Sequence, residues 1–398
     1  MTRTYVSLFS SAGVGDYGFY QSGFKLLASN ELIERRMNVQ LANHIADNDS
    51  AYILGDITKP EIKEKIIDQV NRYYKNKKDT LDLLVATPPC QGISVANHHK
   101  KGEDIKRNSL VLESILVAEK LHPKVIVFEN VKRFLKTACT DINNQTYEIR
   151  QVISRHLARD YNIYGTELNF KDYGANSSRP RTLVISVRKD IPIDPQDLMP
   201  SKQKSKTLRQ VIGNLPSLKK MGEIDKDDIL HTFRPYRADM RAWIHPLKQG
   251  ESAFDNADPL LRPHRIIKGK LVPNVRKNGD KYTRQYWDKV APAIHTRNDI
   301  LASQNTVHPV DDRVFSIREL MLLMNVPSSF RWTKDSYTKL NRMSLEDKKD
   351  WLKQNAITIR QSLGEAVPTI IFRQIGEKTY ARLDEINANN EIKKVNIG

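Results

Sequence analysis

The segment LLVATPPCQGIS, from Leu83 to Ser94, combines an apolar run with two prolines and a cysteine. Pro88 and Pro89 each fix their own φ and push the preceding residue toward an extended conformation, so Cys90 follows a stiff platform. A cysteine attacks carbon as its thiolate, and a basic environment or a helix N-terminus lowers the thiol pKa from about 8.5. A lone cysteine is more commonly a small buried apolar side chain. That interpretation does not explain a cysteine between Pro-Pro and Gln-Gly at a strand end.

Three earlier strand-like runs end in residue types that suit an adenosine-containing cofactor. The first leads into the turn SSAGVGDYG, where Gly13 lets a ligand approach the backbone at a helix N-terminus. The second ends in Glu31, which can hold ribose hydroxyls, and the third leads to Asp56, which can accept a hydrogen bond from an adenine amino group. Either carboxylate alone could equally be a helix cap or a solvated side chain. The three strand ends together predict a cofactor site.

These strand ends belong to an alternating pattern in the first half of the chain. Strand-like runs occupy residues 4–10, 24–31, 51–57, 81–89 and 124–131, and two more follow at 161–170 and 182–189. Helix-like stretches between them occupy residues 35–48, 61–77 and 109–121. Short apolar strands alternating with helices predict an α/β fold with a doubly wound, mostly parallel sheet. Ligands bind such sheets at the carboxyl ends of the strands.

The chain is basic, and the excess positive charge is concentrated in its middle. Net charge is +17, and residues 201–289 contain 20 Lys and Arg against 10 Asp and Glu. That stretch therefore carries 10 of the 17 excess charges in less than a quarter of the chain. It is rich in proline and glycine without a clear period, which predicts a smaller, irregular second domain. Clustered positive charge favours a nucleic-acid partner over a merely soluble surface.

Composition excludes several other classes of protein. Two cysteines, Cys90 and Cys139, make neither a disulfide framework nor a zinc spacing, and we expect no metal. No apolar run approaches the roughly 20 residues of a membrane helix, so we expect no membrane association. The N-terminal residues contain no signal-peptide apolar region, and we expect a cytoplasmic protein.

Several motifs resemble those of one enzyme family in the same order along the chain. PPCQGIS resembles the catalytic motif of the bacterial restriction-modification type of DNA (cytosine-5)-methyltransferases. Six further blocks resemble that family: SLFSSAGVG at 7–15, RNSL at 107–110, FENV at 128–131, NSSRPR at 176–181, RVFSIRELMLLMNVP at 313–327 and QSLGEAVP at 361–368. They span nearly the whole chain except its basic middle, where the family has its variable target-recognition domain. The resemblance implies the Rossmann-like fold of S-adenosylmethionine-dependent methyltransferases.

The resemblance also implies a role for each matching residue. Cytosine is not acidic at carbon 5, so a thiolate, here Cys90, adds to carbon 6 and makes carbon 5 nucleophilic. Glu129 would hold the exocyclic amine and ring nitrogen 3 as charge develops. Arg179 and Arg181 would contact the carbonyl oxygen of the base and the neighbouring backbone. The reacting base is inaccessible inside a duplex, so the nucleotide would be flipped out.

The implied cofactor is S-adenosyl-L-methionine, which leaves as S-adenosyl-L-homocysteine. Its expected binding residues are Phe9, Gly13, Glu31, Asp56, Pro89 and Val367. We expect residues 1–195 to form the catalytic and cofactor-binding domain, 196–299 the target-recognition domain, and 300–398 a return segment that completes the catalytic domain.

The chain departs from the family pattern at a few positions. Ser11 and Val14 stand where the cofactor loop usually has glycine, and Gly15 compensates for the second of these. Ser177 replaces a usual Gln, and Glu365 replaces a usual Asn. We expect cofactor binding to survive these changes.

The expected function is methylation of a short specific site in double-stranded DNA by a monomer, with a restriction endonuclease that cuts the same site as a companion. An RNA methyltransferase of the tRNA-methylating branch is an alternative, although that branch usually lacks so large a basic segment. Amino-methylating DNA enzymes place an aromatic residue where this chain has Cys90. A non-catalytic DNA-binding regulator on the same fold would have no need of that cysteine.

Overall fold

The computed structural model describes residues 2–77, 79–89, 109–275 and 280–395. The chain divides into two compact units. Unit 1 contains residues 1–173, 180–202 and 369–398, and unit 2 contains residues 174–179 and 203–368. Residues 300–368 thus pack within unit 2, and residues 369–398 within unit 1. The functional assignment of the three sequence segments stays a prediction.

A seven-stranded sheet forms the centre of unit 1, with the strand order β3-β2-β1-β4-β5-β9-β8. Its strands are β1 Thr4–Leu8, β2 Lys25–Glu31, β3 Tyr52–Leu54, β4 Leu83–Ala86, β5 Val125–Val131, β8 Tyr161–Asn169 and β9 Pro180–Arg188. The first five run parallel to one another, and β9 pairs antiparallel with both β5 and β8. The predicted doubly wound, mostly parallel sheet is confirmed.

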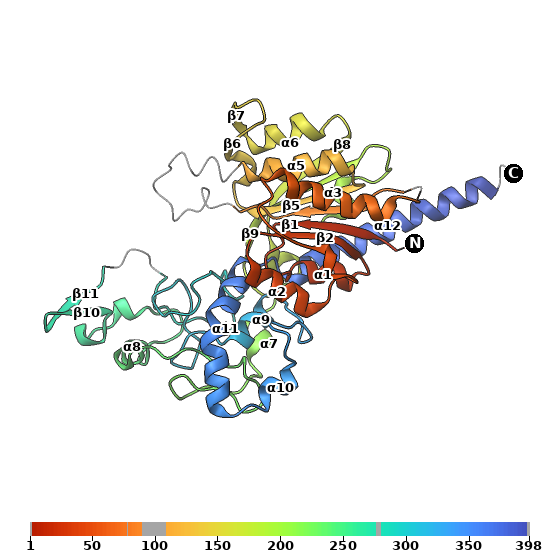
Figure 1. Ribbon diagram of the computed structural model, residues 1–398. Helices are drawn as coiled ribbons and strands as arrows, with labels where there is room; N and C mark the ends of the chain where they lie inside the picture. The colour runs from red at the N-terminus through yellow and green to blue at the C-terminus, as the bar shows by residue number, and fades with distance from the viewer. Residues whose placement is uncertain (1, 78, 90–108, 276–279, 396–398) are drawn as a thin grey trace. The chain divides into compact units, whose positions relative to one another are not determined.

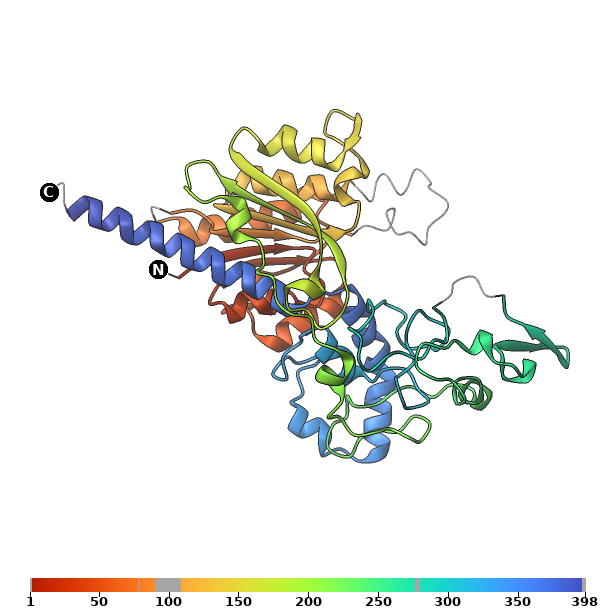
Figure 2. The same cartoon turned by 180° about the vertical axis from the view of Figure 1, so that it is seen from behind.

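Helices cover both faces of this sheet. The helices of unit 1 are α1 Asp16–Gln21, α2 Glu34–Asn43, α3 Pro60–Tyr74, α5 Leu110–Leu121, α6 Ile149–Leu157 and α12 Thr369–Val395. Helices α3, α5 and α6 lie on one face, and α1, α2 and α12 lie on the other (Figures 1 and 2). A small hairpin, β6 Ala138–Thr140 with β7 Thr146–Glu148, precedes α6.

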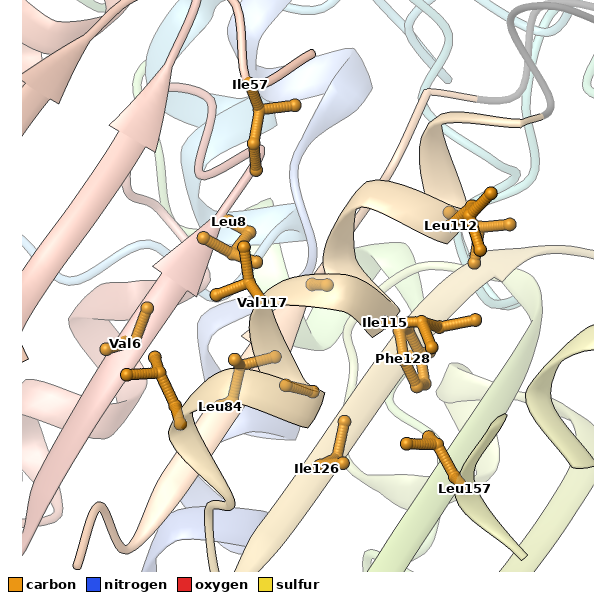
Figure 3. Packing of buried hydrophobic residues seen from close by; sticks show 14 of the residues in the cluster. Val6, Leu8, Ile57, Leu84, Leu112, Ile115, Val117, Ile126, Phe128 and Leu157 are labelled. Carbon is orange, nitrogen blue, oxygen red and sulfur yellow. The ribbon is translucent and has the colours of Figure 1, made fainter. Parts of the chain in front are cut away.

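The core of unit 1 is almost entirely apolar. Side chains from α3, α5 and α6 pack on alternate residues of β1, β4 and β5, because alternate strand residues face the same side. Figure 3 shows Ile115 of α5 beside Phe128 of β5, and both side chains are fully buried. On the opposite face, Phe19 of α1 stacks on Phe372 of α12 with ring centroids 4.9 Å apart. This packing fixes the strand ends that carry the predicted site.

Unit 2 has few regular elements. They are α7 Leu208–Ile212, α8 Ala238–Ile244, β10 His264–Ile267, β11 Lys270–Pro273, α9 Ile317–Leu323, α10 Tyr337–Asn341 and α11 Leu345–Glu365. Its core includes Trp243, Ile244, Leu301, Val307 and Val314. Long irregular stretches connect these elements, as the sequence predicts. No helix in the described part of the chain is long and apolar enough to cross a bilayer.

Candidate active site

Most predicted site residues of unit 1 lie along one edge of the sheet. The parallel strands β3, β2, β1, β4 and β5 lie side by side, so their carboxyl ends share that edge. Asp56, Glu31, Phe9, Pro89 and Glu129 lie at or just after these ends, in that order across the sheet. The strand order reverses between β1 and β4, where the connections on the two sides diverge. This switch point is where open α/β sheets bind ligands.

The turn after β1 is built from left-handed residues. Phe9, Ser11 and Gly13 have φ values of 57°, 52° and 75°. A Cβ on Gly13 would also lie 2.9 Å from Cγ of Gln40, so glycine is required there for space as well as for φ. Ser11 takes the left-handed conformation without being glycine, and its Oγ is buried without a hydrogen-bond partner. The departure at Ser11 is therefore accommodated with backbone strain.

Glu31 holds this turn in place. Its Oε2 accepts a hydrogen bond from the backbone N–H of Ser11 at 2.8 Å, and its Oε1 accepts from the N–H groups of Leu32 and Ile33 at 2.9 Å. The Glu31 side chain is buried. The carboxylate predicted to bind ribose thus has a structural role that the sequence did not indicate.

Asp56 lies on the loop after β3. Its Oδ1 accepts from the backbone N–H of Thr58 at 3.0 Å and from the Thr58 hydroxyl at 2.8 Å. Asn30 donates from Nδ2 to the carbonyl oxygens of Ile53 and Gly55, at 2.9 and 3.1 Å, and so ties the end of β3 to β2. The neighbouring ends of β2 and β3 present one carboxylate each.

The residues at these strand ends fit an adenosine-containing ligand. Carboxylates accept hydrogen bonds from ribose hydroxyls and from the adenine amino group. Each of the two has further acceptor capacity, because Oε2 of Glu31 accepts one hydrogen bond and the two bonds to Asp56 both use Oδ1. Leu32 is 64% exposed directly after Glu31, and it offers an apolar surface for a planar ring. The sequence analysis did not identify Leu32, although it directly follows Glu31, the residue predicted to bind the ribose hydroxyls.

The proline loop after β4 is fixed at its start. Thr87 donates from Oγ1 to the carbonyl oxygen of Phe9 at 2.9 Å, which ties the loop to the turn after β1. Asn130 at the end of β5 donates from Nδ2 to the carbonyl oxygen of Pro88 at 2.9 Å. Pro88 is buried and Pro89 is exposed. Cys90, the predicted nucleophile, lies outside the described residues.

Glu129 and Arg181 form an ion pair at the same edge. Arg181 Nε lies 3.1 Å from Glu129 Oε1. The strand register explains the pair, because Val131 lies opposite Arg181 and alternate residues of β5 share a face. The Glu129 side chain is 7% exposed and that of Arg181 is 17% exposed. The sequence predicted both residues at the site, and the fold brings them together.

Arg179 and Val367 lie in unit 2. Arg179 is buried and donates to the carbonyl oxygens of Gly364, Glu365 and Ile294, at 3.0 to 3.5 Å. Its guanidinium thus joins the end of α11 to the chain before residue 295. Val367 is buried just after α11.

The second cysteine, Cys139, does not suit nucleophilic chemistry. Cys139 is fully buried, and burial first of all, then the charge of Asp141, raises its thiol pKa to about 12. Such a thiol is a poor nucleophile at neutral pH. Among the described residues, no cluster of His, Cys, Asp or Glu is arranged to hold a metal ion.

The fold and the edge site together define an α/β enzyme of the Rossmann-like class. A family-level sequence comparison matches residues 3–380 to the family described as C-5 cytosine-specific DNA methylase. The chain belongs to this family, and it is a DNA (cytosine-5)-methyltransferase.

Individual relatives agree with this assignment. The chain is 31% identical to the Type II methyltransferase M1.HgaI of Avibacterium volantium, over 94% of this chain and 97% of that protein. It is 23% identical to the Type II methylase M.HgiDII of Herpetosiphon aurantiacus, over 99% of each. Among solved structures, DNMT2 of Spodoptera frugiperda has a TM-score of 0.54 at 12% identity, covering 95% of this chain and 99% of that one. The last similarity shows the fold alone.

Proposed function

We propose that this protein transfers a methyl group from S-adenosyl-L-methionine to carbon 5 of a cytosine in a short site of double-stranded DNA. In this proposal Cys90 bonds transiently to carbon 6. The supporting observation is the 3.1 Å Glu129–Arg181 pair, next to Asn130 of β5, which donates to the carbonyl oxygen of Pro88 in the loop after β4. A carboxyl group and a guanidinium side by side complement the polar edge of cytosine, which has an amine, a ring nitrogen and a carbonyl oxygen.

The roles of the polar residues follow from where charge develops. When the thiolate of Cys90 adds to carbon 6, negative charge spreads toward nitrogen 3 and the carbonyl oxygen. The carboxyl group of Glu129 accepts a hydrogen bond from the exocyclic amine and supplies a proton to nitrogen 3, and Arg181 donates to the carbonyl oxygen. Once carbon 5 carries the methyl group, its proton leaves to solvent and the electron pair of the carbon–hydrogen bond expels the cysteine sulfur as thiolate. Nitrogen 3 returns its proton to Glu129, and the aromatic ring is restored. Arg179 acts on neighbouring backbone, consistent with its bonds to three carbonyl oxygens.

S-adenosyl-L-methionine, when bound, supplies an electrophilic methyl group. We assign the ribose hydroxyls to Glu31 and the adenine amino group to Asp56. The left-handed turn containing Phe9 and Gly13 lets the ligand approach the backbone closely. We also assign Pro89 and Val367 to the cofactor site.

The biological setting is proposed from the relatives. They are named Type II methyltransferases, which favours the modification half of a restriction-modification system with a companion endonuclease. The target base must leave the helix to be reached, and base flipping is the established route for such chemistry. We assign the choice of sequence to the basic segment 196–299.

The decisive experiment traps the covalent intermediate. DNA with 5-fluorocytosine at the methylated site lacks the proton that must leave carbon 5, so the enzyme should remain attached through residue 90, detected by mass spectrometry of the tryptic peptide. Cys90→Ser should abolish methyl transfer and leave DNA binding within a fewfold of wild type. An active Cys90→Ser variant would contradict the assignment.

A second variant tests the carboxyl group. Glu129→Gln should lower methyl transfer roughly 100-fold, since it removes the proton donor at nitrogen 3. Glu64→Gln, on the exposed face of α3, is the matched control and should be as active as wild type. Assaying duplex DNA and tRNA in parallel identifies the substrate, and methylation of tRNA alone would reject the DNA proposal.

A further inference from the structure

The basic segment of unit 2 contains one antiparallel hairpin. Strands β10 and β11 pair with Ile266 opposite Leu271 and Ile267 opposite Lys270. Two residues, Lys268 and Gly269, make the turn, with φ values of 49° and 75°. Positive φ at both positions is the geometry of a type I′ turn, which matches the twist of paired strands. The hairpin is therefore a regular two-stranded ribbon within an otherwise irregular region.

The base of the ribbon is anchored in unit 2. His264, the first residue of β10, is buried with its ring 5.0 Å from that of Trp243. Arg237 donates to the carbonyl oxygen of His264 at 3.2 Å, and the N–H of Asn274 donates to the carbonyl oxygen of Pro263 at 2.9 Å. These contacts fix where the ribbon leaves the body of the unit.

The tip of the ribbon stands free of the rest of unit 2. Ile266 is 68% exposed and Leu271 is 40% exposed, although they face each other across the strands and could have formed part of a core. A Cβ placed on Gly269 would meet no atom within 4 Å. Both views show β10 and β11 projecting from the other elements of unit 2 (Figures 1 and 2). An exposed apolar pair adds little to the stability of an isolated hairpin. The pair therefore indicates a binding surface.

The charge of the ribbon indicates what it binds. Arg265, Lys268 and Lys270 are exposed, and none makes an ion pair with another described residue. The sequence from residue 259 to 279 contains no Asp or Glu. Unpaired cations around an apolar pair complement a polyanion that also presents apolar edges.

We propose that the β10–β11 hairpin enters the major groove of the DNA substrate and determines which sites are methylated. This inference rests on the proposed function. The major groove, about 12 Å wide, admits a two-stranded ribbon, and thymine methyl groups line it as apolar features. Ile266 and Leu271 contact base edges, and the three cations contact phosphates. A second copy of this chain, with a net charge of +17, complements these cations poorly, and DNA is the polyanion that the chain's family acts on.

Two variants separate the two kinds of contact. Ile266→Ser combined with Leu271→Ser removes the apolar pair and keeps every charge. Arg265→Ala, Lys268→Ala and Lys270→Ala combined remove the cations and keep the pair. Matched controls in and near α10 and α11 are Leu345→Ser, at an exposed apolar residue, and the triple variant Lys334→Ala, Lys349→Ala and Lys353→Ala, at exposed lysines.

The readouts are duplex binding at several salt concentrations and sequencing of methylated cytosines in plasmid DNA. The cation variant should bind all duplexes more weakly, with the slope of log affinity against log salt reduced by about 2 to 3. The apolar variant should keep the salt slope but lose roughly tenfold in preference for the wild-type site over sites with one base pair changed. Both controls should match wild type.

The outcomes distinguish this inference from the proposal that it rests on. A wild-type protein that methylates no DNA refutes the proposed function. A wild-type protein that methylates DNA while both hairpin variants keep its site preference and salt slope refutes the hairpin assignment alone. The assignment is also overturned if the apolar variant loses only self-association in sedimentation, or only binding to phosphatidylserine vesicles, with DNA selectivity unchanged.

Discussion

Unit 1 and unit 2 satisfy their buried backbone in different ways. In unit 1 a seven-stranded sheet pairs the buried peptide groups, and an apolar core covers it. Unit 2 has long irregular stretches whose carbonyl oxygens cannot pair in a ladder. Buried arginines donate to them instead: Arg284 to the carbonyl oxygens of Ile244, His308 and Asp311, and Arg360 to those of Thr232, Asn298 and Phe315. Buried polar groups must be paired, and a guanidinium with its five donors can pair several distant segments at once.

Two buried acids, one in each unit, have opposite pKa shifts. In unit 2, burial raises the pKa of Glu319, but the ion pair with Arg313 outweighs it and holds the pKa at about 2. In unit 1, burial raises the pKa of Asp16 to about 7, against a smaller lowering by Ser7. Asp16 Oδ1 is buried without a hydrogen-bond partner. Glu319 keeps its charge through its ion pair with Arg313, whereas Asp16 has no cationic partner among the described residues, and burial raises its pKa.

The largest effect is expected for Arg360→Met, which tests whether buried arginines pair the backbone carbonyl oxygens of unit 2. Methionine fills similar space but leaves the buried carbonyl oxygens of Asn298 and Phe315 unpaired, at about 1–3 kcal/mol each, so unit 2 should lose roughly 2–6 kcal/mol of unfolding free energy. The carbonyl oxygen of Thr232 keeps the N–H of Ile317 as a donor. All four tryptophans, at 243, 287, 332 and 351, lie in unit 2, so tryptophan fluorescence during urea denaturation reports on that unit. Exposed Arg342→Met is the control and should change stability by less than about 0.5 kcal/mol. Equal midpoints for both variants would refute the bridging role.

The next largest effect is a pH-dependent change in the stability of unit 1, caused by Asp16. Since the folded-state pKa of Asp16 is raised to about 7, its contribution to stability is complete below the unfolded pKa near 3.8 and is lost as pH rises through 7. Asp16→Asn stays neutral, so it should match wild type below pH 3.8 and exceed it by roughly 4 kcal/mol above about pH 8. Hydrogen exchange of peptides from β1 and α1 at several pH values measures this. A difference that does not vary with pH would contradict the shifted pKa.

Glu319→Gln should show the opposite pH dependence. The stabilisation by the ionised Glu319 is present above pH 4.5 and is lost as pH falls toward 2. The variant should therefore be less stable than wild type at pH 7, and the gap should close in acid. Tryptophan fluorescence follows this directly, and a gap that widens in acid would exclude the paired, ionised state.

A smaller effect is expected at Ser11. Ser11→Gly removes a left-handed serine and a buried unpaired hydroxyl, and should stabilise unit 1 by about 1 kcal/mol. Ser11→Ala removes the hydroxyl but keeps the backbone strain, so comparing the two variants by thermal unfolding assigns the cause. A glycine variant less stable than wild type would refute the backbone strain at Ser11.

Much of unit 1 could be predicted from the sequence. Alternating apolar strands and amphipathic helices are local signals, and the ends of β2 and β5 carry Glu31 and Glu129 as predicted. Two features escaped this reasoning. The antiparallel direction of β9 depends on pairing with β5, and the hydrogen bond from Ser11 to Glu31 joins residues 20 positions apart.

Unit 2 was harder to predict because its order comes from distant polar contacts. Arg360 bonds to a carbonyl oxygen 128 positions away, and nothing near it in the sequence distinguishes it from a surface or DNA-binding arginine. Helix α11 was missed for a different reason. Its apolar residues form no strong stripe, although Ser344 followed by Asp347 is a readable N-cap signal.

The path of the chain has a consequence for how this enzyme can change its specificity. The backbone passes between the two units four times, after residues 173, 179, 202 and 368. A single proteolytic nick therefore leaves the halves tethered. Recombination that exchanges residues 203–368 would transfer the hairpin proposed to contact DNA in one piece. It would leave behind residues 174–179, whose Arg179 must still find carbonyl oxygens in the incoming sequence. Successful natural exchanges should therefore preserve the backbone shape around residues 294 and 364, however freely the β10–β11 hairpin varies.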